Sequence, residues 1–142
     1  MEQRVSLITL GVVDAGKAAA FYDALGWTRV ATQDSVIAYD LLGQTVGLYP
    51  LDKLAEDIGI SAAQLGRGAM TLGYNTRDRS GVDDVMGRVE AAGGTVLKLP
   101  QEVFWGGYHG YFSDPEGHIW EVAHNPFSPL RDSDGAFRWS GY

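Results

Sequence analysis

The sequence predicts one α+β domain that contains two copies of a βαβββ unit. The first observation is that two segments follow one plan, "LITLGVVDAGKAAAFYDALGWTRV" and "AMTLGYNTRDRSGVDDVMGRVEAAGGTVLKL", each with TLG in an apolar strand ahead of a helix. The second is the presence of 19 glycines in 142 residues, which indicates many turns. The expected divisions are a first unit at 1–50, a linker with a short helix at 51–68, a second unit at 69–126 and a C-terminal arm at 127–142.

The first unit opens with a half-buried strand, because Ile8, Leu10 and Val12 alternate with other residues. Asp14 can cap the helix that follows, and Gly26 can end it. The apolar positions of this helix recur at helical spacing and are Ala18, Phe21, Tyr22 and Leu25. Three further strands are expected, at 28–31, 36–40 and 45–49.

The second unit repeats this order. Met70 and Leu72 alternate in its first strand, and Ser80 with Asp83 resembles a capping box at the start of its helix. The apolar face of that helix consists of Val82, Val85, Met86 and Val89. Strands are expected at 95–99, 108–113 and 118–123.

The linker and the tail are expected to be simpler. A short helix should begin at Asp52, between the two units. The tail has no sustained period, but it contains Phe127, Phe137 and Trp139, which are costly to leave in water. It is therefore expected to lie as an irregular arm over the body or over a neighbouring subunit.

Composition excludes several classes of protein. The net charge is −7 and no basic stripe is present, which argues against a nucleic-acid partner. Cysteine is absent, which excludes thiol nucleophiles, cysteine zinc sites and disulfides and fits a reducing compartment. The apolar stretch from Val5 to Val13 is too short for a membrane span. We therefore expect a cytoplasmic protein with neither a nucleic acid nor a membrane as partner.

Two βαβββ units, with "FYDALGW" after the first strand and "FSDPEGHIWEV" entering the last, resemble the vicinal oxygen chelate superfamily. This superfamily includes glyoxalase I, bleomycin resistance proteins and extradiol dioxygenases. The run "WGGYHGYFSDPEGHIWEVAHNP" is similar to a bacterial glyoxalase-like subgroup. The resemblance implies the glyoxalase/bleomycin resistance fold, in which eight strands form a cup-shaped mixed sheet around the ligand, and it implies a homodimer.

The resemblance also implies a divalent metal, held by side chains from the first and last strands of each half. The corresponding positions in this sequence are Leu7, Ala69 or Met70, Gly47 or Leu48, and Glu121. Only Glu121 can bind a hard metal ion, and one carboxylate cannot offset dehydration of the ion. We therefore expect no metal and no other cofactor, with a metal held by atypical ligands as the alternative.

Glu121 is the first candidate for chemistry, as a base or acid or as an anchor for a cationic or hydroxylated group. His109 lies in another strand and could approach it across the sheet, so both residues are candidate catalytic groups. The alternative for Glu121 is a structural hydrogen-bonding role. His118 and His124 alternate with Glu121 and should point away from it, His118 in a turn and His124 at a strand end with a backbone hydrogen bond.

Six further residues are candidates for ligand binding because they can stack or hydrogen-bond around a concave site. They are Trp105, Tyr108, Thr9, Thr71, Asn75 and Tyr49. Core packing is the alternative for Trp105, and hydrogen bonding to nearby backbone is the alternative for the threonines and Asn75. Trp120, which alternates with Glu121, is expected in the core beneath the helix.

These residues support three functional hypotheses. The first is a binding or sequestering protein similar to the bleomycin resistance proteins. The second is an enzyme, either a lyase or isomerase similar to lactoylglutathione lyase that uses Glu121 for proton transfer, or a metal-dependent enzyme with atypical ligands. The third is a structural or interaction domain. The sequence alone leaves the choice between enzyme and binding protein open.

Overall fold

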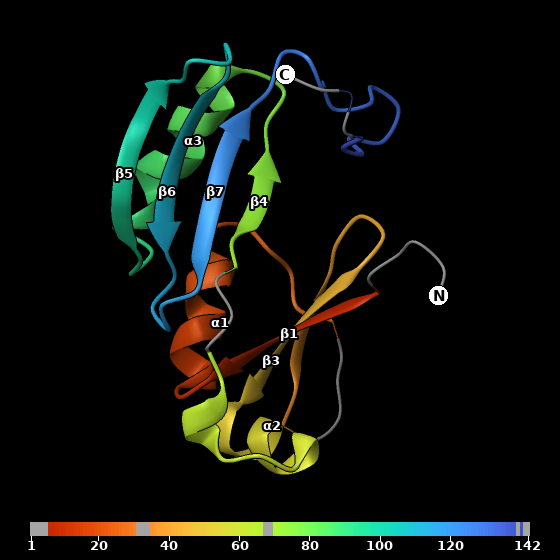
Figure 1. Cartoon of the computed structure of the whole chain (residues 1–142), viewed down its shortest axis with the longest axis vertical. Coiled ribbons are helices and arrows are strands. Elements are labelled where there is room, and N and C mark those ends of the chain that lie inside the picture. Colours follow the sequence, from red (N-terminus) through yellow and green to blue (C-terminus); the bar gives the residue numbers. More distant parts are fainter. Residues whose placement is uncertain (1–5, 31–34, 67–69, 139, 141–142) are drawn as a thin grey trace. The chain divides into compact units, whose positions relative to one another are not determined.

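The computed structural model describes residues 6–30, 35–66, 70–138 and 140. The chain forms two compact units, the first from Met1 to Ala69 and the second from Met70 to Tyr142 (Figure 1). No helix among the described residues is long and apolar enough to span a membrane.

The first unit contains a sheet with the strand order β1-β3-β2. The chain runs through β1 (Leu7–Val12), α1 (Ala15–Ala24), β2 (Ile37–Asp40) and β3 (Thr45–Pro50), and β1 pairs with β3 in parallel. Val30 forms an isolated antiparallel bridge with Ala38 of β2, at the place of the expected strand at 28–31. Residue 31 of that strand lies outside the described residues. A linker follows with α2 (Leu51–Ile58), one residue earlier than expected, and a 3-10 turn, η1 (Ala62–Gln64).

The second unit repeats this topology with the strand order β4-β7-β6-β5. Its elements are β4 (Leu72–Asn75), α3 (Arg79–Val89), β5 (Thr95–Glu102), β6 (Tyr108–Ser113) and β7 (Ile119–His124). In both units the first strand runs parallel to the last one, and the remaining neighbours are antiparallel. The predicted α+β class with two related units is therefore confirmed, with seven strands and the Val30 bridge in the described part of the chain.

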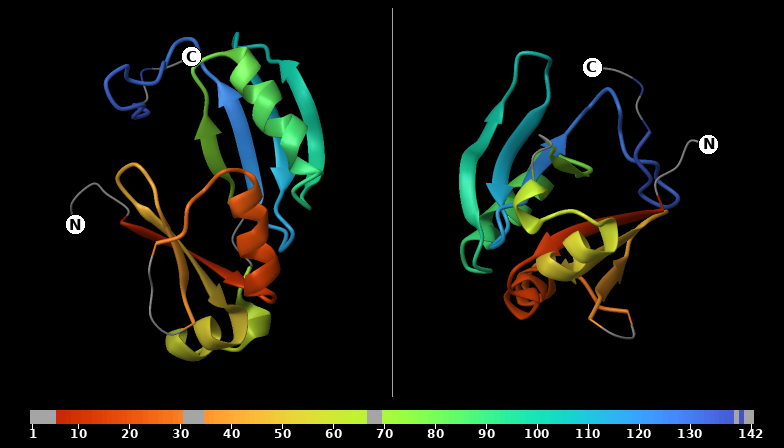
Figure 2. Two further views of the ribbon diagram at one scale, coloured as in Figure 1. Left: turned by 180° about the vertical axis from the view of Figure 1, so that it is seen from behind. Right: turned by 60° about the horizontal axis from the view of Figure 1, so that its bottom comes forward.

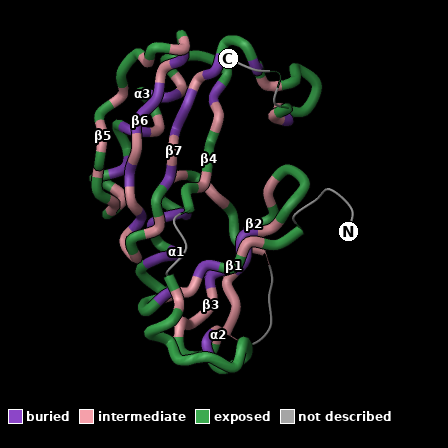
Figure 3. The backbone as a smooth tube through the Cα atoms, in the orientation of Figure 1, coloured by how far each residue is buried: buried purple, intermediate pink, exposed green. Residues whose placement is uncertain are grey.

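Each sheet buries the face that its helix covers. In the first unit Leu10 and Val12 of β1 alternate as predicted with exposed Thr9 and half-buried Gly11, and both are buried. In the second unit α3 packs on β5, β6 and β7 and lies across one face of the sheet (Figure 2). Its Val82, Met86 and Val89 are buried with Phe112, Trp120 and Val122, as the purple segments in Figure 3 indicate. Trp120 therefore belongs to the core, as the sequence predicts.

The "FYDALGW" segment builds the core of the first unit. Phe21 and Tyr22 are buried on α1, Gly26 ends the helix region with a φ of 102°, and the chain returns so that Trp27 stacks on Tyr22 at 4.9 Å between ring centroids. Tyr39 of β2 lies 5.8 Å from Tyr22 and closes the aromatic cluster. The motif is therefore a packing motif in this chain.

The two helix caps differ in how well the sequence predicts them. Asp14 caps α1 as expected, because its carboxylate accepts from the backbone N–H of Lys17 at 2.9 Å. The capping box expected at Ser80 and Asp83 is wrong. Helix α3 starts earlier, with Asp78 accepting from the N–H of Gly81 at 2.8 Å while the Ser80 hydroxyl donates to the same carboxylate oxygen. An aspartate is as good a cap as serine, and Asp78 lies two residues nearer to β4.

Strand β5 is the outer strand of the second sheet and is irregular. Its pairing with β6 shifts register twice, between Val96 and Lys98 and again between Lys98 and Gln101. Leu97 and Leu99 lie in these irregular stretches and are exposed. The register shifts keep Lys98 paired with Tyr111, on the face of the sheet opposite to α3.

The Tyr39 hydroxyl predicts a measurable pH dependence of stability. It lies 2.9 Å from an Asp23 carboxylate oxygen and 3.1 Å from the Ala19 carbonyl. Burial, followed by the hydrogen bond to Asp23, raises the pKa of Tyr39 from 10.0 to about 12. A raised pKa means that the folded chain holds this proton more tightly than the unfolded chain, so its contribution is complete below pH 10 and is lost as the pH rises.

We therefore expect the free energy of unfolding to fall by about 2 kcal/mol from this group between pH 10 and 12. Urea unfolding at several pH values should show a shallower decline for Tyr39→Phe than for the native chain. Parallel declines in the two proteins would contradict the role of this hydroxyl.

Candidate functional site

The β6–β7 turn sets the register that places Glu121 beside the side chains of β6. Asp114 is buried, and its Oδ1 accepts from the N–H groups of Glu116 at 3.0 Å and His118 at 2.8 Å. Its Oδ2 pairs with Nδ1 of His118 at 2.8 Å, which places His118 in the turn as predicted. Gly117 has a φ of 89°, a conformation that glycine adopts without strain. The segment "DPEGH" therefore fixes the register in which Glu121 lies opposite Tyr111.

Glu121 is held by two side chains of β6. Its Oε1 lies 2.7 Å from Nδ1 of His109 and accepts a hydrogen bond from the Tyr111 hydroxyl at 3.0 Å. His109 is buried, with 10% of its side chain exposed, whereas 29% of the Glu121 side chain is exposed. Oε2 has no hydrogen-bond partner among the described residues. One carboxylate oxygen is therefore anchored in the protein, and the other remains available to a ligand.

Lys98 fixes the proton on His109. Its Nζ lies 3.2 Å from Nε2 of His109 and 5.8 Å from the centre of the Tyr111 ring. Because an ammonium group can only donate, Nε2 accepts and the imidazole proton sits on Nδ1, from which it donates to Glu121. Both ring nitrogens of His109 are thus engaged, Nδ1 by Glu121 and Nε2 by Lys98.

Tyr111 keeps its proton in this environment. Burial, followed by the hydrogen bond to Glu121 and the charge of that carboxylate, raises the pKa of Tyr111 above its usual value. The hydroxyl therefore stays a donor at neutral pH. Together, His109 and Tyr111 hold the Glu121 carboxylate in one orientation.

Trp105 lies in the turn between β5 and β6, folded back over Gly107. A Cβ atom on Gly107 would lie 1.8 Å from the Trp105 ring, so only glycine allows the indole to take this place. The ring meets His109 edge to face, with 6.5 Å between centroids. Gly106 has a φ of 91°, which completes the turn. The "WGG" sequence thus creates an aromatic wall beside the His109–Glu121 pair.

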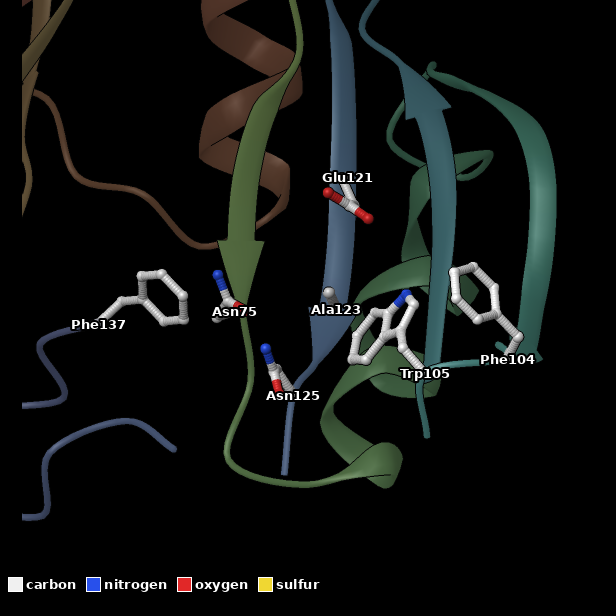
Figure 4. Close-up of a pocket in the computed structure, with 7 residues that line it drawn as sticks. All are labelled: Asn75, Phe104, Trp105, Glu121, Ala123, Asn125 and Phe137. Atoms are coloured by element: carbon white, nitrogen blue, oxygen red, sulfur yellow. The ribbon is translucent and has the colours of Figure 1, made fainter. Parts of the chain in front are cut away.

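A pocket of about 460 Å³ lies on this face of the second unit. Three aromatic and three polar side chains line it, namely Phe104, Trp105, Phe137, Asn75, Glu121 and Asn125. Figure 4 shows Glu121 on β7 above Ala123, with Asn75 on one side and Trp105 and Phe104 on the other. The volume falls within the range of small-molecule sites, roughly 300–1,000 Å³.

The C-terminal arm supplies part of this wall. Asn125 accepts from the N–H groups of Phe127 at 2.9 Å and Ser128 at 3.2 Å, which turns the chain at the end of β7. The Phe127 ring lies near Gly106, where a Cβ atom would be 3.2 Å from it. Phe137 reaches the pocket. Phe127 and Phe137 of the arm therefore lie on the second unit, which is one of the two expected placements. Trp139 lies outside the described residues.

The predicted site residues separate into two groups. Glu121, His109, Trp105 and Asn75 come together, with all but His109 in the pocket wall. The placement of Tyr108 beside them is wrong. Strand alternation turns it to the α3 side, where its hydroxyl donates to Asp83 at 2.8 Å and Arg79 lies 5.7 Å from its ring centre.

The remaining candidates lie elsewhere. Thr71 is exposed and precedes β4. Thr9 and Tyr49 belong to the first unit, where Thr9 is exposed and Tyr49 pairs with Gly11. The hydrogen bond expected for His124 is not present at Nδ1, which is buried and has no partner in the described part of the chain. For Thr9, Thr71 and Tyr49 a binding role stays a prediction.

Several residues of the site escape sequence analysis. Tyr111 could have been found, because it alternates with His109 and so shares its face. The place of Lys98 beside His109 depends on the register shifts of β5, which the sequence does not predict. Phe104 and Phe137 lie outside helices and strands, where no regular spacing indicates which way a side chain points. Asn125 has a local signal, since Asn before an irregular segment often makes a turn of this kind.

The donor set does not fit the divalent metal that the resemblance implies. No group of three or more His, Asp or Glu side chains in the described ranges could hold an ion. Leu7, Gly47 and Leu48 carry no donor in their side chains, Met70 is exposed, and Ala69 lies outside the described residues. Oε1 of Glu121 is already engaged by His109 and Tyr111. We therefore derive no chemical step through a metal.

Comparisons with known proteins agree on one family. The model of the Glyoxalase/Bleomycin resistance protein/Dioxygenase superfamily matches residues 4–122. A crystal structure of a glyoxalase-related enzyme from Fulvimarina pelagi is 36% identical, with 99% of this chain and 100% of that chain covered and a TM-score of 0.90. No curated protein matches the sequence.

More distant structures share the fold. A glyoxalase/bleomycin resistance protein/dioxygenase family enzyme from Burkholderia phytofirmans is 20% identical, with 84% and 96% of the two chains covered and a TM-score of 0.73. A lactoylglutathione lyase from Agrobacterium tumefaciens is 22% identical, with 88% and 96% covered and a TM-score of 0.67.

The Trp105 wall can be tested through Gly107. A methyl group at residue 107 would occupy the space of the indole, so Gly107→Ala should displace the ring and shift the indole N–H resonance of Trp105. Gly87→Ala on α3 is the matched control, because a Cβ atom there meets nothing within 4 Å. An unchanged Trp105 resonance in Gly107→Ala would show that the ring does not rest on this glycine.

Proposed function

The chain belongs to the Glyoxalase/Bleomycin resistance protein/Dioxygenase superfamily, and we propose that it binds a small organic molecule in the pocket beside Glu121. The observation that carries this proposal is that the two oxygens of the Glu121 carboxylate have different surroundings. His109 and Tyr111 hold Oε1, while Oε2 is left for a ligand group in an aromatic-walled site. Such a site combines apolar contact area with one oriented polar anchor.

Binding of this kind needs no metal. The ligand would stack against Trp105 and Phe104 and would donate a hydrogen bond to Glu121. Because His109 and Tyr111 already satisfy Oε1, the carboxylate does not need to rearrange when a ligand enters. A preorganised anchor of this kind lowers the cost of association.

A second candidate function is proton transfer by Glu121, in a lyase or isomerase. The specific observation in its favour is the His109–Glu121–Tyr111 array, in which the candidate base is oriented by neighbouring donors. In this case Glu121 is the group that touches substrate. His109 acts through Glu121 as a positioning residue, because its two nitrogens are engaged by Glu121 and Lys98. Assembly as a homodimer and a cytoplasmic location stay predictions.

Two substitutions separate the two functions. If the chain is a binding protein, Trp105→Ala should weaken binding by about tenfold or more, because it removes a large apolar contact. No bound compound should then be converted. If Glu121 is a base, Glu121→Gln should leave binding within a few fold while turnover falls by ~10².

These variants are compared by calorimetry and by product analysis with a panel of small aromatic and carbonyl compounds. The control Glu102→Gln removes the same charge from the opposite face of the sheet, where Glu102 pairs with Arg79. A ligand that binds equally well to the native chain and to both pocket variants would overturn the proposed site.

The metal content gives an independent prediction. Protein purified without chelator should contain far less than one zinc, nickel, manganese or iron ion per chain, since only Glu121 matches the donor positions of the family. Elemental analysis of the native chain and of Glu121→Gln tests this. One ion per chain that is lost in Glu121→Gln would contradict the metal-free proposal.

A further inference from the structure

The charge of the pocket wall indicates which ligands it can hold. Among the described residues that line it, Glu121 is the only one with a charged side chain. The cation on the same face of the sheet, Lys98, is bound to Nε2 of His109 and is not part of the lining. The described part of the pocket wall therefore presents one negative charge and no positive one.

The aromatic side chains of the pocket wall, like the charge of Glu121, favour a cationic ligand. The faces of aromatic rings carry partial negative charge and attract cations. Phe104 is 98% exposed, so the faces of its ring are not covered by other residues of the described chain. Trp105 and Asn75 lie on opposite sides of Ala123, as Figure 4 shows. Ring faces and carboxylate together favour a flat ligand with positive charge.

The polar side chains of the pocket wall favour a ligand that has hydrogen-bond donors. Oε2 of Glu121 can only accept while the carboxylate is ionised. The Asn75 side chain, which makes no hydrogen bond within the described ranges, can both donate and accept. The amide oxygen of Asn125 is occupied by two backbone N–H groups. A ligand edge that carries N–H groups thus matches this wall, and a carboxylate edge does not.

We propose that the pocket selects planar organic cations with N–H donors, such as amidinium groups or protonated amino-heterocycles, through Oε2 of Glu121 and the ring faces of Trp105 and Phe104. This inference rests on the proposed binding function and narrows its ligand class. An anionic ligand would face Glu121 unless Lys98 left His109 to meet it, and that movement would remove the partner that fixes the proton on His109.

Three probes of the same shape and different charge test the proposal. Naphthamidinium, naphthamide and naphthoate share one ring system, and binding of each is measured by calorimetry. We expect naphthamidinium to bind at least about tenfold more tightly than naphthamide, and naphthoate to bind most weakly. The affinity for naphthamidinium should fall with added salt, whereas that for naphthamide should stay nearly constant.

Variants assign the preference to the pocket. Glu121→Gln should bring naphthamidinium and naphthamide to within a few fold of each other, whereas Glu102→Gln should leave the tenfold difference in place. Thermal unfolding of each variant checks that the fold is retained. If Lys98→Met increases the affinity for naphthamidinium only slightly, the lysine stays outside the pocket as described.

The outcomes distinguish the inference from the function that it rests on. If naphthoate binds as tightly as naphthamidinium and Trp105→Ala abolishes both, the charge selection is wrong while ligand binding at this pocket stands. If none of the three probes binds, both the selection and the proposed binding site for planar ligands are overturned.

Discussion

The buried carboxylate of Asp114 is the interaction on which the candidate site depends. It binds two backbone N–H groups and the His118 ring, and so closes the β6–β7 turn in a single register. Because side chains alternate along a strand, a slip of one residue would send Glu121 to the α3 side and bring Trp120 to the pocket. The "DPEGH" segment therefore sets the geometry in which the proposed ligand anchor, Glu121, faces the pocket.

The two units use one topology for different purposes. In the first, the "FYDALGW" segment produces a closed aromatic core in which Trp27 stacks on Tyr22. In the second, Trp105 of the β5–β6 turn lies over Gly107 and forms one wall of the pocket. The two units thus share a backbone topology but use their aromatic side chains differently. Packing constrains the residues on the helix-covered face of each sheet and leaves those on the other face free to differ.

The sequence predicts the features that depend on a regular spacing of residues. It predicts few of the features that depend on irregular segments of the chain. Alternation was sufficient to place His109 near Glu121 and Trp120 in the core. The aromatic ring of Tyr108 makes it a candidate for the pocket, but it is adjacent to His109 in β6, and adjacent residues of a strand lie on opposite faces of the sheet. Phe137 comes from an arm without a repeat, and the role of Lys98 requires the register shifts of β5. Such features depend on three-dimensional contacts that no local pattern encodes.

The irregular outer strand has a consequence for solubility. A regular, flat edge would offer its backbone groups to a strand of another molecule and could seed cross-β aggregates. Two register shifts and Pro100 interrupt that template in β5, even though Leu97 and Leu99 are exposed there. The strand that brings Lys98 to its histidine is thereby also a poor nucleus for fibril growth.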